Sequence, residues 1–182
     1  MNIEIRDAVI EDAELVGWAM LEALGIPADS EYNKIDVWRR EDILYSWTRT
    51  RVALADGVPV GCLISYPGEE YAALRIHTWE LIFGETSQDA DRYDSETFPG
   101  EYYLDSLAVL PQYRGHGIGK ALLMDGVAKG HAAGFERVTL IVDVDKPKNI
   151  SLYESLGFER ESQMSFFGHT YWRMRYFLKM KS

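Results

Sequence analysis

The stretch that most constrains this chain is a glycine-rich turn that joins an apolar segment to the start of an amphipathic one. It covers residues 107–123 and reads Leu-Ala-Val-Leu-Pro-Gln-Tyr-Arg-Gly-His-Gly-Ile-Gly-Lys-Ala-Leu-Leu. This order predicts a strand, a tight turn and the first turn of a helix. At such a junction, the glycine amides and the helix N-terminus direct free N–H groups at one place, which favours an anion. Arg114 and Lys120 add positive charges beside it, so the stretch predicts a phosphate-binding site.

Two common phosphate-binding loops do not fit this spacing. A P-loop opens on a glycine and places Ser or Thr after its Gly-Lys pair, whereas the corresponding residues here are Arg114 and Ala121. The dinucleotide fingerprint needs a glycine where this chain has Lys120, and an acidic residue about 20 residues further on. The turn therefore predicts neither a nucleoside triphosphate site nor a dinucleotide site.

A second pattern follows at a short distance along the chain. Residues 138–144 are mostly β-branched and bounded by turn formers, which predicts a buried strand. Residues 149–158 then read as a short helix that ends at Gly157 and contains the string Leu-Tyr-Glu-Ser-Leu-Gly-Phe.

Together the two patterns resemble the GNAT superfamily, the acyl-CoA-dependent N-acetyltransferases. Gln112-x-x-Gly115-x-Gly117, followed by Ile-Gly-Lys-Ala-Leu-Leu, looks like the family's pyrophosphate-binding motif, and Leu-Tyr-Glu-x-Leu-Gly-Phe is similar to its second signature. The resemblance is specific from about Leu104 to Phe158 and general in layout outside that range. It implies an α/β (α+β) fold, in which helices flank a mixed, twisted central sheet of six to seven strands. We expect one domain that covers residues 1–182.

The resemblance also implies an activity, in which acetyl-CoA gives its acetyl group directly to a primary amine through a tetrahedral intermediate. The cofactor would enter where the strands that contain Asp105 and Val142 separate. Family members often carry a pantetheine-binding asparagine at the position that is Lys146 here, so this contact departs from the family pattern, and Asn149 lies closer to the helix. The cofactor-binding residues that the resemblance implies are Leu107, Ala108, Val109, Gln112, Arg114, Gly115, His116, Gly117, Ile118, Gly119, Lys120 and Asn149.

Two residues are the candidate catalytic groups. Asp105 is a charged residue within an otherwise apolar strand, where an ionised carboxylate is costly without a purpose or a partner, so we interpret it as the base. Glu80 and Glu101 are reserve candidates for the base, and a water chain is a further one. The family signature makes Tyr153 the general acid, because a phenol can donate a proton to a departing thiolate. The alternatives are an ion pair for Asp105 and a packed aromatic ring for Tyr153.

Residues 84–100 form the most loop-like segment and are strongly acidic. They predict either a substrate-side lid that attracts a cationic amine or a solvated loop. The identity of the amine stays open among peptides, lysine side chains, polyamines, aminoglycosides and amino acids.

Composition limits the function classes. The chain has 182 residues, 47% of them hydrophobic, which is typical of a globular protein. Its net charge of -10 argues against nucleic acid as a partner, and no stretch is long and apolar enough for a membrane span. Cys62 is the single cysteine, which suits a reducing cytoplasm, and the four histidines show no metal-ligand spacing, so we expect no metal.

The rest of the chain predicts the remaining elements. Asp56-Gly57 between apolar runs predicts a hairpin. Arg173, Arg175 and Lys179 alternate along the last strand, which predicts a solvated face; the alternative is an edge of positive charge that holds an acidic partner or the phosphates of CoA. The aromatic residues of that strand make a homodimer surface possible. The further expected elements are strands over 3–9, 51–55, 58–65 and 74–83, helices over 11–24 and 36–48, and a closing hairpin over 161–167 and 170–179.

Two other classes remain as alternatives. A non-catalytic acyl-CoA sensor would share the fold and the phosphate loop, yet it would not need both Asp105 and Tyr153. An interaction protein would use the glycines merely to turn the chain, which does not account for the Arg, His and Lys residues among them. CoA binding separates the second alternative from an enzyme, and thioester consumption separates the first.

Overall fold

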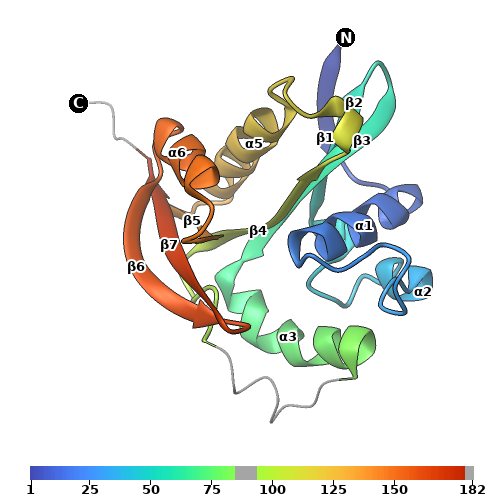
Figure 1. Cartoon of the computed structure of the whole chain (residues 1–182), viewed down its shortest axis with the longest axis horizontal. Coiled ribbons are helices and arrows are strands. Elements are labelled where there is room, and N and C mark those ends of the chain that lie inside the picture. The colour runs from blue at the N-terminus through green and yellow to red at the C-terminus, as the bar shows by residue number, and fades with distance from the viewer. Residues whose placement is uncertain (85–93, 179–182) are drawn as a thin grey trace.

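A single mixed sheet runs through residues 1–84 and 94–178, which are the residues that this computed structural model describes (Figure 1). Its strands are β1 (Ile3–Asp7), β2 (Thr50–Ala55), β3 (Val58–Pro67), β4 (Tyr102–Val109), β5 (Arg137–Asp143), β6 (Glu159–Phe166) and β7 (His169–Phe177). They follow the order β1-β2-β3-β4-β5-β7-β6 across the sheet. Neighbours are antiparallel except β4 and β5, which are parallel. The predicted α/β fold with six to seven strands is confirmed.

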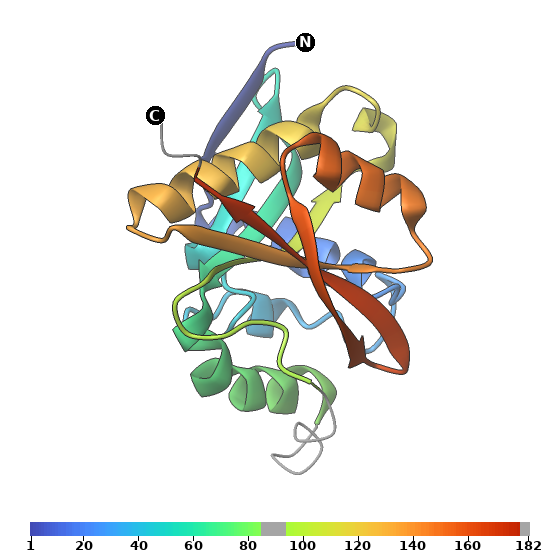
Figure 2. The same ribbon diagram turned by 90° about the vertical axis from the view of Figure 1, so that its left-hand side faces the viewer.

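Helices cover both faces of the sheet (Figure 2). On one face lie α5 (Ile118–Ala132) and α6 (Pro147–Ser155), and on the other lie α1 (Ala13–Ala23), α2 (Ile35–Trp38) and α3 (Gly68–Phe83). Turns of 3-10 helix occur at Ile10–Asp12, Trp47–Arg49 and Pro111–Tyr113.

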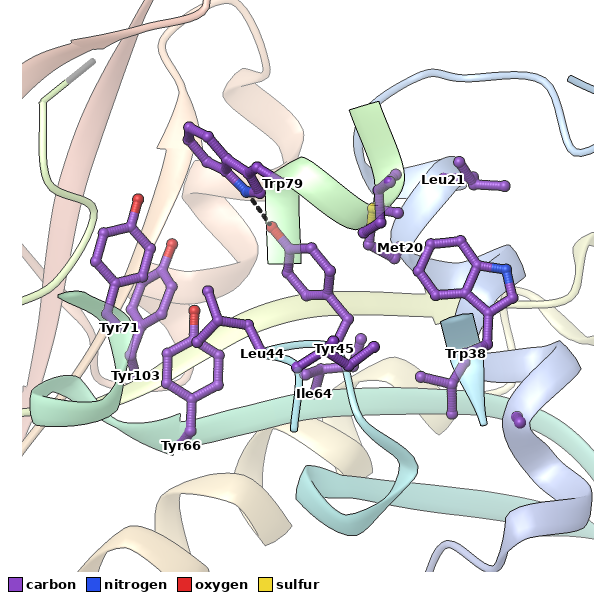
Figure 3. Close-up of a cluster of buried hydrophobic side chains, with 14 of the residues drawn as sticks. Met20, Leu21, Trp38, Leu44, Tyr45, Ile64, Tyr66, Tyr71, Trp79 and Tyr103 are labelled. Atoms are coloured by element: carbon purple, nitrogen blue, oxygen red, sulfur yellow. Dashed lines mark hydrogen bonds between the residues drawn. The ribbon is translucent and has the colours of Figure 1, made fainter. Parts of the chain in front are cut away.

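Two apolar clusters fill the spaces between the sheet and these helices. Successive side chains of a strand point to opposite faces. On β3, Ile64 and Tyr66 therefore face the cluster beneath α1, α2 and α3, while Leu63 faces the cluster beneath α5 and α6. The first cluster is rich in aromatic side chains, and the hydroxyl groups of Tyr66, Tyr71 and Tyr103 point the same way within it (Figure 3).

The local signals for turns are confirmed. Asp56 and Gly57 join β2 to β3 with φ values of 49° and 83°, the left-handed pair that a two-residue hairpin turn requires. The helix predicted over 11–24 is a 3-10 turn followed by α1, and α6 ends shortly before Gly157, whose φ is 103°.

Two predictions of secondary structure are wrong. The strand predicted over 74–83 is the C-terminal part of α3, whose buried side chains Tyr71, Thr78, Trp79 and Ile82 recur at helical spacing. Its β-branched and aromatic composition suggested a strand, although its periodicity is that of a helix. In place of the helix predicted over 36–48, the structure has the short helix α2 and, after an irregular stretch, a 3-10 turn.

The closing hairpin is confirmed, but its charged face is not a solvated one. β7 lies inside the sheet, between β5 and β6. Arg173 is buried in an ion pair with Glu101, which corrects the prediction that it faces solvent. Arg175 is half-buried and pairs with Glu161, while Lys179 lies outside the described residues. Because β7 is an interior strand, its edge is already paired, and dimerisation through its aromatic side chains stays a prediction.

Candidate active site

The site begins where the two parallel strands separate. Among the described residues, β4 and β5 pair at two positions, Tyr102 with Val138 and Tyr103 with Thr139. Beyond these pairs a cavity of about 200 Å³ lies between the strands, lined by residues 104–107 of β4 and 140–143 of β5. The predicted separation of the strands that contain Asp105 and Val142 is therefore present.

A bulge in β4 directs Asp105 toward this cavity. In the β3–β4 ladder, Ser106 pairs with Ile64 and Leu104 pairs with Ser65, so Asp105 between them has no partner residue on β3. An extra residue of this kind bends the strand and redirects a side chain.

The carboxylate of Asp105 lies in a largely apolar environment with two hydroxyl donors. Tyr66 Oη donates a hydrogen bond to Oδ2, and Ser106 Oγ donates one to Oδ1 at 2.8 Å. Burial raises the pKa of Asp105 above its ordinary value, and the two hydrogen bonds oppose this rise. A carboxylate with a raised pKa is a stronger base than an exposed one, which suits the role expected from the sequence.

A second carboxylate, which the sequence did not single out, lines the same cavity. Glu96 is 7% exposed, and its two oxygens accept hydrogen bonds from Tyr71 Oη at 2.9 Å and Tyr103 Oη at 3.0 Å. Burial raises the pKa of Glu96, and the charge of Asp105 raises it further. Glu96 belongs to the acidic segment 84–100, whose composition suggested solvated residues, so only the tertiary structure reveals that it is buried.

Tyr153 reaches the cavity from α6. Its side chain lines the cavity together with Lys146 and Asn149 and packs edge-on against Phe158, with ring centroids 6.1 Å apart. Burial raises the pKa of Tyr153, so its phenol stays protonated at neutral pH. The structure thus brings Asp105 and Tyr153, the two predicted catalytic residues, to one cavity.

A groove of about 610 Å³ adjoins this cavity, and four residues line both: Ala23, Leu107, Lys146 and Asn149. Gly117, with a φ of 79°, is the N-cap of α5, and the first N–H groups of a helix have no partner within the helix. Of the predicted cofactor-binding residues, those that line the groove are Leu107, Ala108, Val109, Arg114, Gly115, Gly117, Ile118, Gly119, Lys120 and Asn149.

Gln112 and His116 do not line this groove. Gln112 is exposed on the 3-10 turn, and Nδ1 of His116 faces the carbonyl oxygens of Tyr113 and Arg114 at 3.2 and 3.0 Å. Arg114 itself donates to the Val109 carbonyl at 2.9 Å and to Glu22 Oε1 at 2.9 Å, so it braces the turn. The backbone amides of the turn and the exposed Lys120 are then the main groups available for a phosphate.

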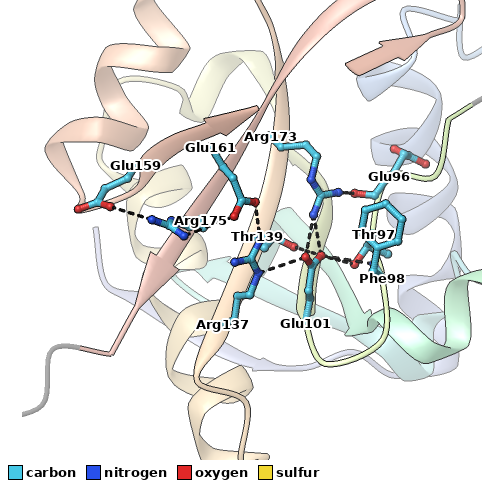
Figure 4. Close-up of polar contacts among 10 residues, drawn as sticks. All are labelled: Glu96, Thr97, Phe98, Glu101, Arg137, Thr139, Glu159, Glu161, Arg173 and Arg175. Carbon is cyan, nitrogen blue, oxygen red and sulfur yellow. Dashed lines mark hydrogen bonds and ion pairs between the residues drawn. The ribbon is translucent and has the colours of Figure 1, made fainter. Parts of the chain in front are cut away.

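The reserve candidates for the base lie elsewhere. Glu80 is exposed on α3, not on a strand, and does not line the cavity. Glu101 is buried and accepts hydrogen bonds from Arg173 at 2.8 and 2.9 Å and from Thr139 at 3.0 Å (Figure 4). Burial alone would raise the pKa of Glu101, but the hydrogen bonds and charge of Arg173 hold it below its ordinary value. Glu101 is therefore a structural ion-pair partner.

The part of the chain that the structure describes gives little support for a catalytic thiol or a metal site. Cys62 is fully buried on β3, and burial raises the pKa of its thiol to about 12, so it is not a nucleophile. No group of three or more His, Cys, Asp or Glu side chains that could hold a metal occurs among residues 1–84 and 94–178. In the same residues, no helix has the length and apolar character needed to cross a membrane. Of the predicted lid, residues 85–93 lie outside the described part.

Comparison with known proteins shows which family this sequence resembles. The sequence model of the "Acetyltransferase (GNAT) family" matches residues 17–158. Mycothiol acetyltransferase of Thermobispora bispora is 43% identical over 61 residues, which cover 34% of this chain and 20% of that protein. That of Renibacterium salmoninarum is 41% identical over 61 residues, or 34% of this chain and 18% of that protein. The matched part of the chain thus spans about a fifth of the length of these curated relatives.

Solved structures extend the likeness to almost the whole chain. A crystal structure described as an acetyltransferase is 28% identical, with a TM-score of 0.78 over 97% of this chain and 100% of that one. PaiA N-acetyltransferase from Thermoplasma acidophilum, solved in complex with coenzyme A, shares the fold at 21% identity, with a TM-score of 0.58 over 98% of this chain and 100% of that one. Because the family model covers well over half of the residues, this chain belongs to the GNAT acetyltransferase family.

Proposed function

We propose that this protein is an acetyl-CoA-dependent N-acetyltransferase that acts on a cationic primary amine, with residues 1–182 working as one catalytic domain. The observation that carries the proposal is the meeting of two sites at the opening between β4 and β5. The groove at the start of α5 adjoins the cavity that holds Asp105, Glu96 and Tyr153. The residues that line both are Ala23, Leu107, Lys146 and Asn149.

The groove suits the diphosphate of coenzyme A. Gly115 and Gly117 have φ values of 80° and 79°, which other residues rarely adopt, and no heavy atom lies within 4 Å of a Cβ built on either. Their backbone is therefore free to approach a ligand, and the amides at the start of α5 favour an anion. Lys120 adds an exposed positive charge, and Lys146 with Asn149 offers polar groups between the groove and the cavity. When bound, the cofactor supplies an acetyl thioester.

The residues of the cavity can each perform one part of the transfer. Asp105 accepts a proton from the incoming ammonium group, so that the nitrogen lone pair can form the new C–N bond. Backbone N–H groups of β4 near Leu107 can stabilise the oxyanion of the tetrahedral intermediate. Tyr153 donates a proton to the sulfur as the C–S bond breaks and its electron pair leaves with sulfur. The attacking nitrogen loses its second proton as the amide forms, and this proton restores the Tyr153 phenol. The net change turns an ammonium ion and a thioester into an amide, a thiol and one proton.

A non-catalytic acyl-CoA sensor stays the runner-up, and nothing in the cavity favours it. A buried carboxylate, a half-buried carboxylate and a half-buried phenol around one opening are a costly arrangement for a protein that only binds the cofactor. We expect the protein to work in the cytoplasm, as its single buried thiol suggests.

The test is thiol release from acetyl-CoA over a panel of peptides, polyamines, aminoglycosides and amino acids. We expect amine-dependent release by the wild type and much slower release by Asp105→Asn and Tyr153→Phe, while coenzyme A binding, measured by calorimetry, is retained. Coenzyme A binding without release from any amine would favour the sensor. Absence of coenzyme A binding would overturn both readings.

A further inference from the structure

We infer that the acceptor carries a second positive charge, and that Glu96 binds this charge while the other amine of the acceptor reacts at Asp105. The inference rests on the proposed acetyl transfer and adds to it the class of substrate, a small diamine or a larger amine with the same spacing of charges. It follows from the two carboxylates in one cavity, which have different surroundings and can have different tasks.

Glu96 has the capacity to bind a cation. Each of its carboxylate oxygens accepts one tyrosine hydroxyl, Tyr71 on Oε2 and Tyr103 on Oε1, and an ionised oxygen can accept further hydrogen bonds. Among residues 1–84 and 94–178, no Lys or Arg side chain forms an ion pair with this carboxylate. Arg75, which lies over the Tyr71 ring at 5.3 Å, offsets its negative charge only from a distance.

A single ammonium group cannot balance both carboxylates through the reaction. The attacking nitrogen must be neutral, so it loses its charge when Asp105 takes its proton. From that moment an ionised Glu96 would be a buried carboxylate without a cation, a penalty that it avoids only by keeping a proton, as its raised pKa favours. A second ammonium group that keeps its proton removes this penalty, and it does so in the state that precedes attack. Glu96 would therefore act as a specificity-determining residue.

The backbone around Glu96 is fixed, as a binding residue requires. Arg173 from β7 donates to the backbone carbonyl of Glu96 and at the same time forms the buried ion pair with Glu101 (Figure 4). Thr97 Oγ1 donates a hydrogen bond to Glu101 Oε2 at 3.0 Å, which joins the residue after Glu96 to the residue before β4. These contacts hold the backbone that carries the Glu96 carboxylate, although Glu96 belongs to no helix or strand.

The cavity that holds the two carboxylates also offers apolar surface for a methylene chain. Leu104, Ile141, Phe166 and Tyr171 line the cavity with apolar surface. A third carboxylate on the wall, Asp143, is already engaged, since it lies 3.2 Å from Nδ1 of His169 and accepts the backbone N–H of Asp145 at 2.9 Å. The pair available to a substrate is then Glu96 and Asp105.

Three acceptors of equal length test the inference: butylamine, aminobutanol and putrescine. They differ only at the far end, which is a methyl group, a hydroxyl group or an ammonium group. With saturating acetyl-CoA, we expect kcat/KM for putrescine to exceed that for butylamine and for aminobutanol by on the order of 30-fold, which corresponds to a buried charge pair. Equal values for the three would overturn the inference.

Glu96→Gln should abolish this preference, so that putrescine reacts no better than butylamine, while Glu96→Asp should restore part of it. Glu70→Gln is the matched control, because it removes one negative charge from α3 outside the cavity and should keep the preference. Coenzyme A affinity and melting temperature show that each variant is folded. A preference that survives Glu96→Gln in a folded variant would overturn the inference.

The same data separate this inference from the proposed function. Turnover of a panel acceptor with a single amine, together with no release from putrescine, would overturn the inference and leave an acetyltransferase. No release from any acceptor would overturn both.

Discussion

Asp105 and Tyr153 show which parts of a site a sequence can reveal at the level of residues. Asp105 is conspicuous because it is charged within an apolar run, and Tyr153 because it belongs to a family signature. Glu96 has neither mark, since it stands among other acidic residues in a segment without apolar periodicity. Its importance comes from contacts with Tyr71 and Tyr103, which no local pattern encodes.

The hydroxyl of Tyr153 should matter for chemistry and not for packing. Tyr153→Phe keeps the ring against Phe158 and removes only the proton donor, so we expect kcat to fall by roughly 10²- to 10⁴-fold with unchanged coenzyme A affinity. Tyr176→Phe is the matched control, because Tyr176 packs against the same Phe158 ring at 5.5 Å and does not line the cavity. Steady-state thiol release measures both, and equal rates in the two variants would contradict the role of Tyr153 as the acid.

The pKa of Asp105 predicts the acidic side of the pH profile. Burial favours the protonated carboxyl and raises the pKa, so the base form is lost at a higher pH than for an exposed aspartate. We therefore expect kcat/KM to fall as the pH drops through this raised value, and the corresponding limb to be absent in Asp105→Asn. The measurement is kcat/KM against pH for both proteins with one amine. An identical limb in the variant would assign it to the substrate or to another group.

At the level of elements, signals within a few residues were reliable and signals that depend on burial were not. Asp56-Gly57 specified its hairpin because the two residues tolerate the required left-handed backbone. The stretch 74–83 was misassigned because its aromatic and β-branched residues suit a strand, although its buried residues Thr78, Trp79 and Ile82 recur at helical spacing. Arg173 was wrongly expected to face solvent, because the alternation of charged residues along a strand does not show whether the strand lies inside the sheet or at its edge.

The start of α3 holds the segment that contains Glu96. The N–H of Gly68 donates to the Glu101 carbonyl at 2.7 Å, and a Cβ on Gly68 would lie 2.0 Å from the Phe98 carbonyl oxygen. Gly68→Ala must therefore push this backbone away, and we expect a loss of about 1–3 kcal/mol in unfolding free energy together with weaker acceptor binding.

Gly126→Ala is the control for this prediction. Its Cβ would meet the side-chain ends of Leu63 and Leu104, which can rotate away, so we expect a smaller loss. Urea denaturation and the KM for the amine measure the effects. An equal loss of stability in both variants, with KM unchanged in Gly68→Ala, would show that the contact with Phe98 does not fix the segment.

At the level of the whole molecule, the opening between β4 and β5 divides the sheet, and buried charges join its two parts. The Arg173–Glu101 pair links β7 to the residue that precedes β4, while Arg137 on β5 contacts both Glu101 and Glu161 (Figure 4). The cavity can thus remain open because this network holds the strands together on the far side of it. The sequence predicted the opening through the family resemblance, but it gave no sign of the network.

Breaking one side of this network should cost much more than removing a surface pair. Arg173→Met leaves Glu101 buried with less compensation, and we expect a loss of about 3–5 kcal/mol in unfolding free energy. Because Arg173 holds the pKa of Glu101 below its ordinary value, the stability from this pair is present at neutral pH and is lost as the pH falls through that lowered value. The difference between wild type and variant should therefore shrink in acid. Arg40→Met, which breaks the exposed Arg40–Asp42 pair, should leave the unfolding free energy almost unchanged.

The double variant Arg173→Met/Glu101→Met then tests whether the pair is needed for stability or for the position of Glu96. We expect it to regain much of the unfolding free energy, since no buried charge is left without its partner, yet to keep a raised KM for the amine, because the Glu96 carbonyl has lost its donor. Denaturation curves and kinetics on the same preparations measure both quantities. Recovery of stability together with a wild-type KM would show that Glu96 is positioned by its tyrosine partners alone.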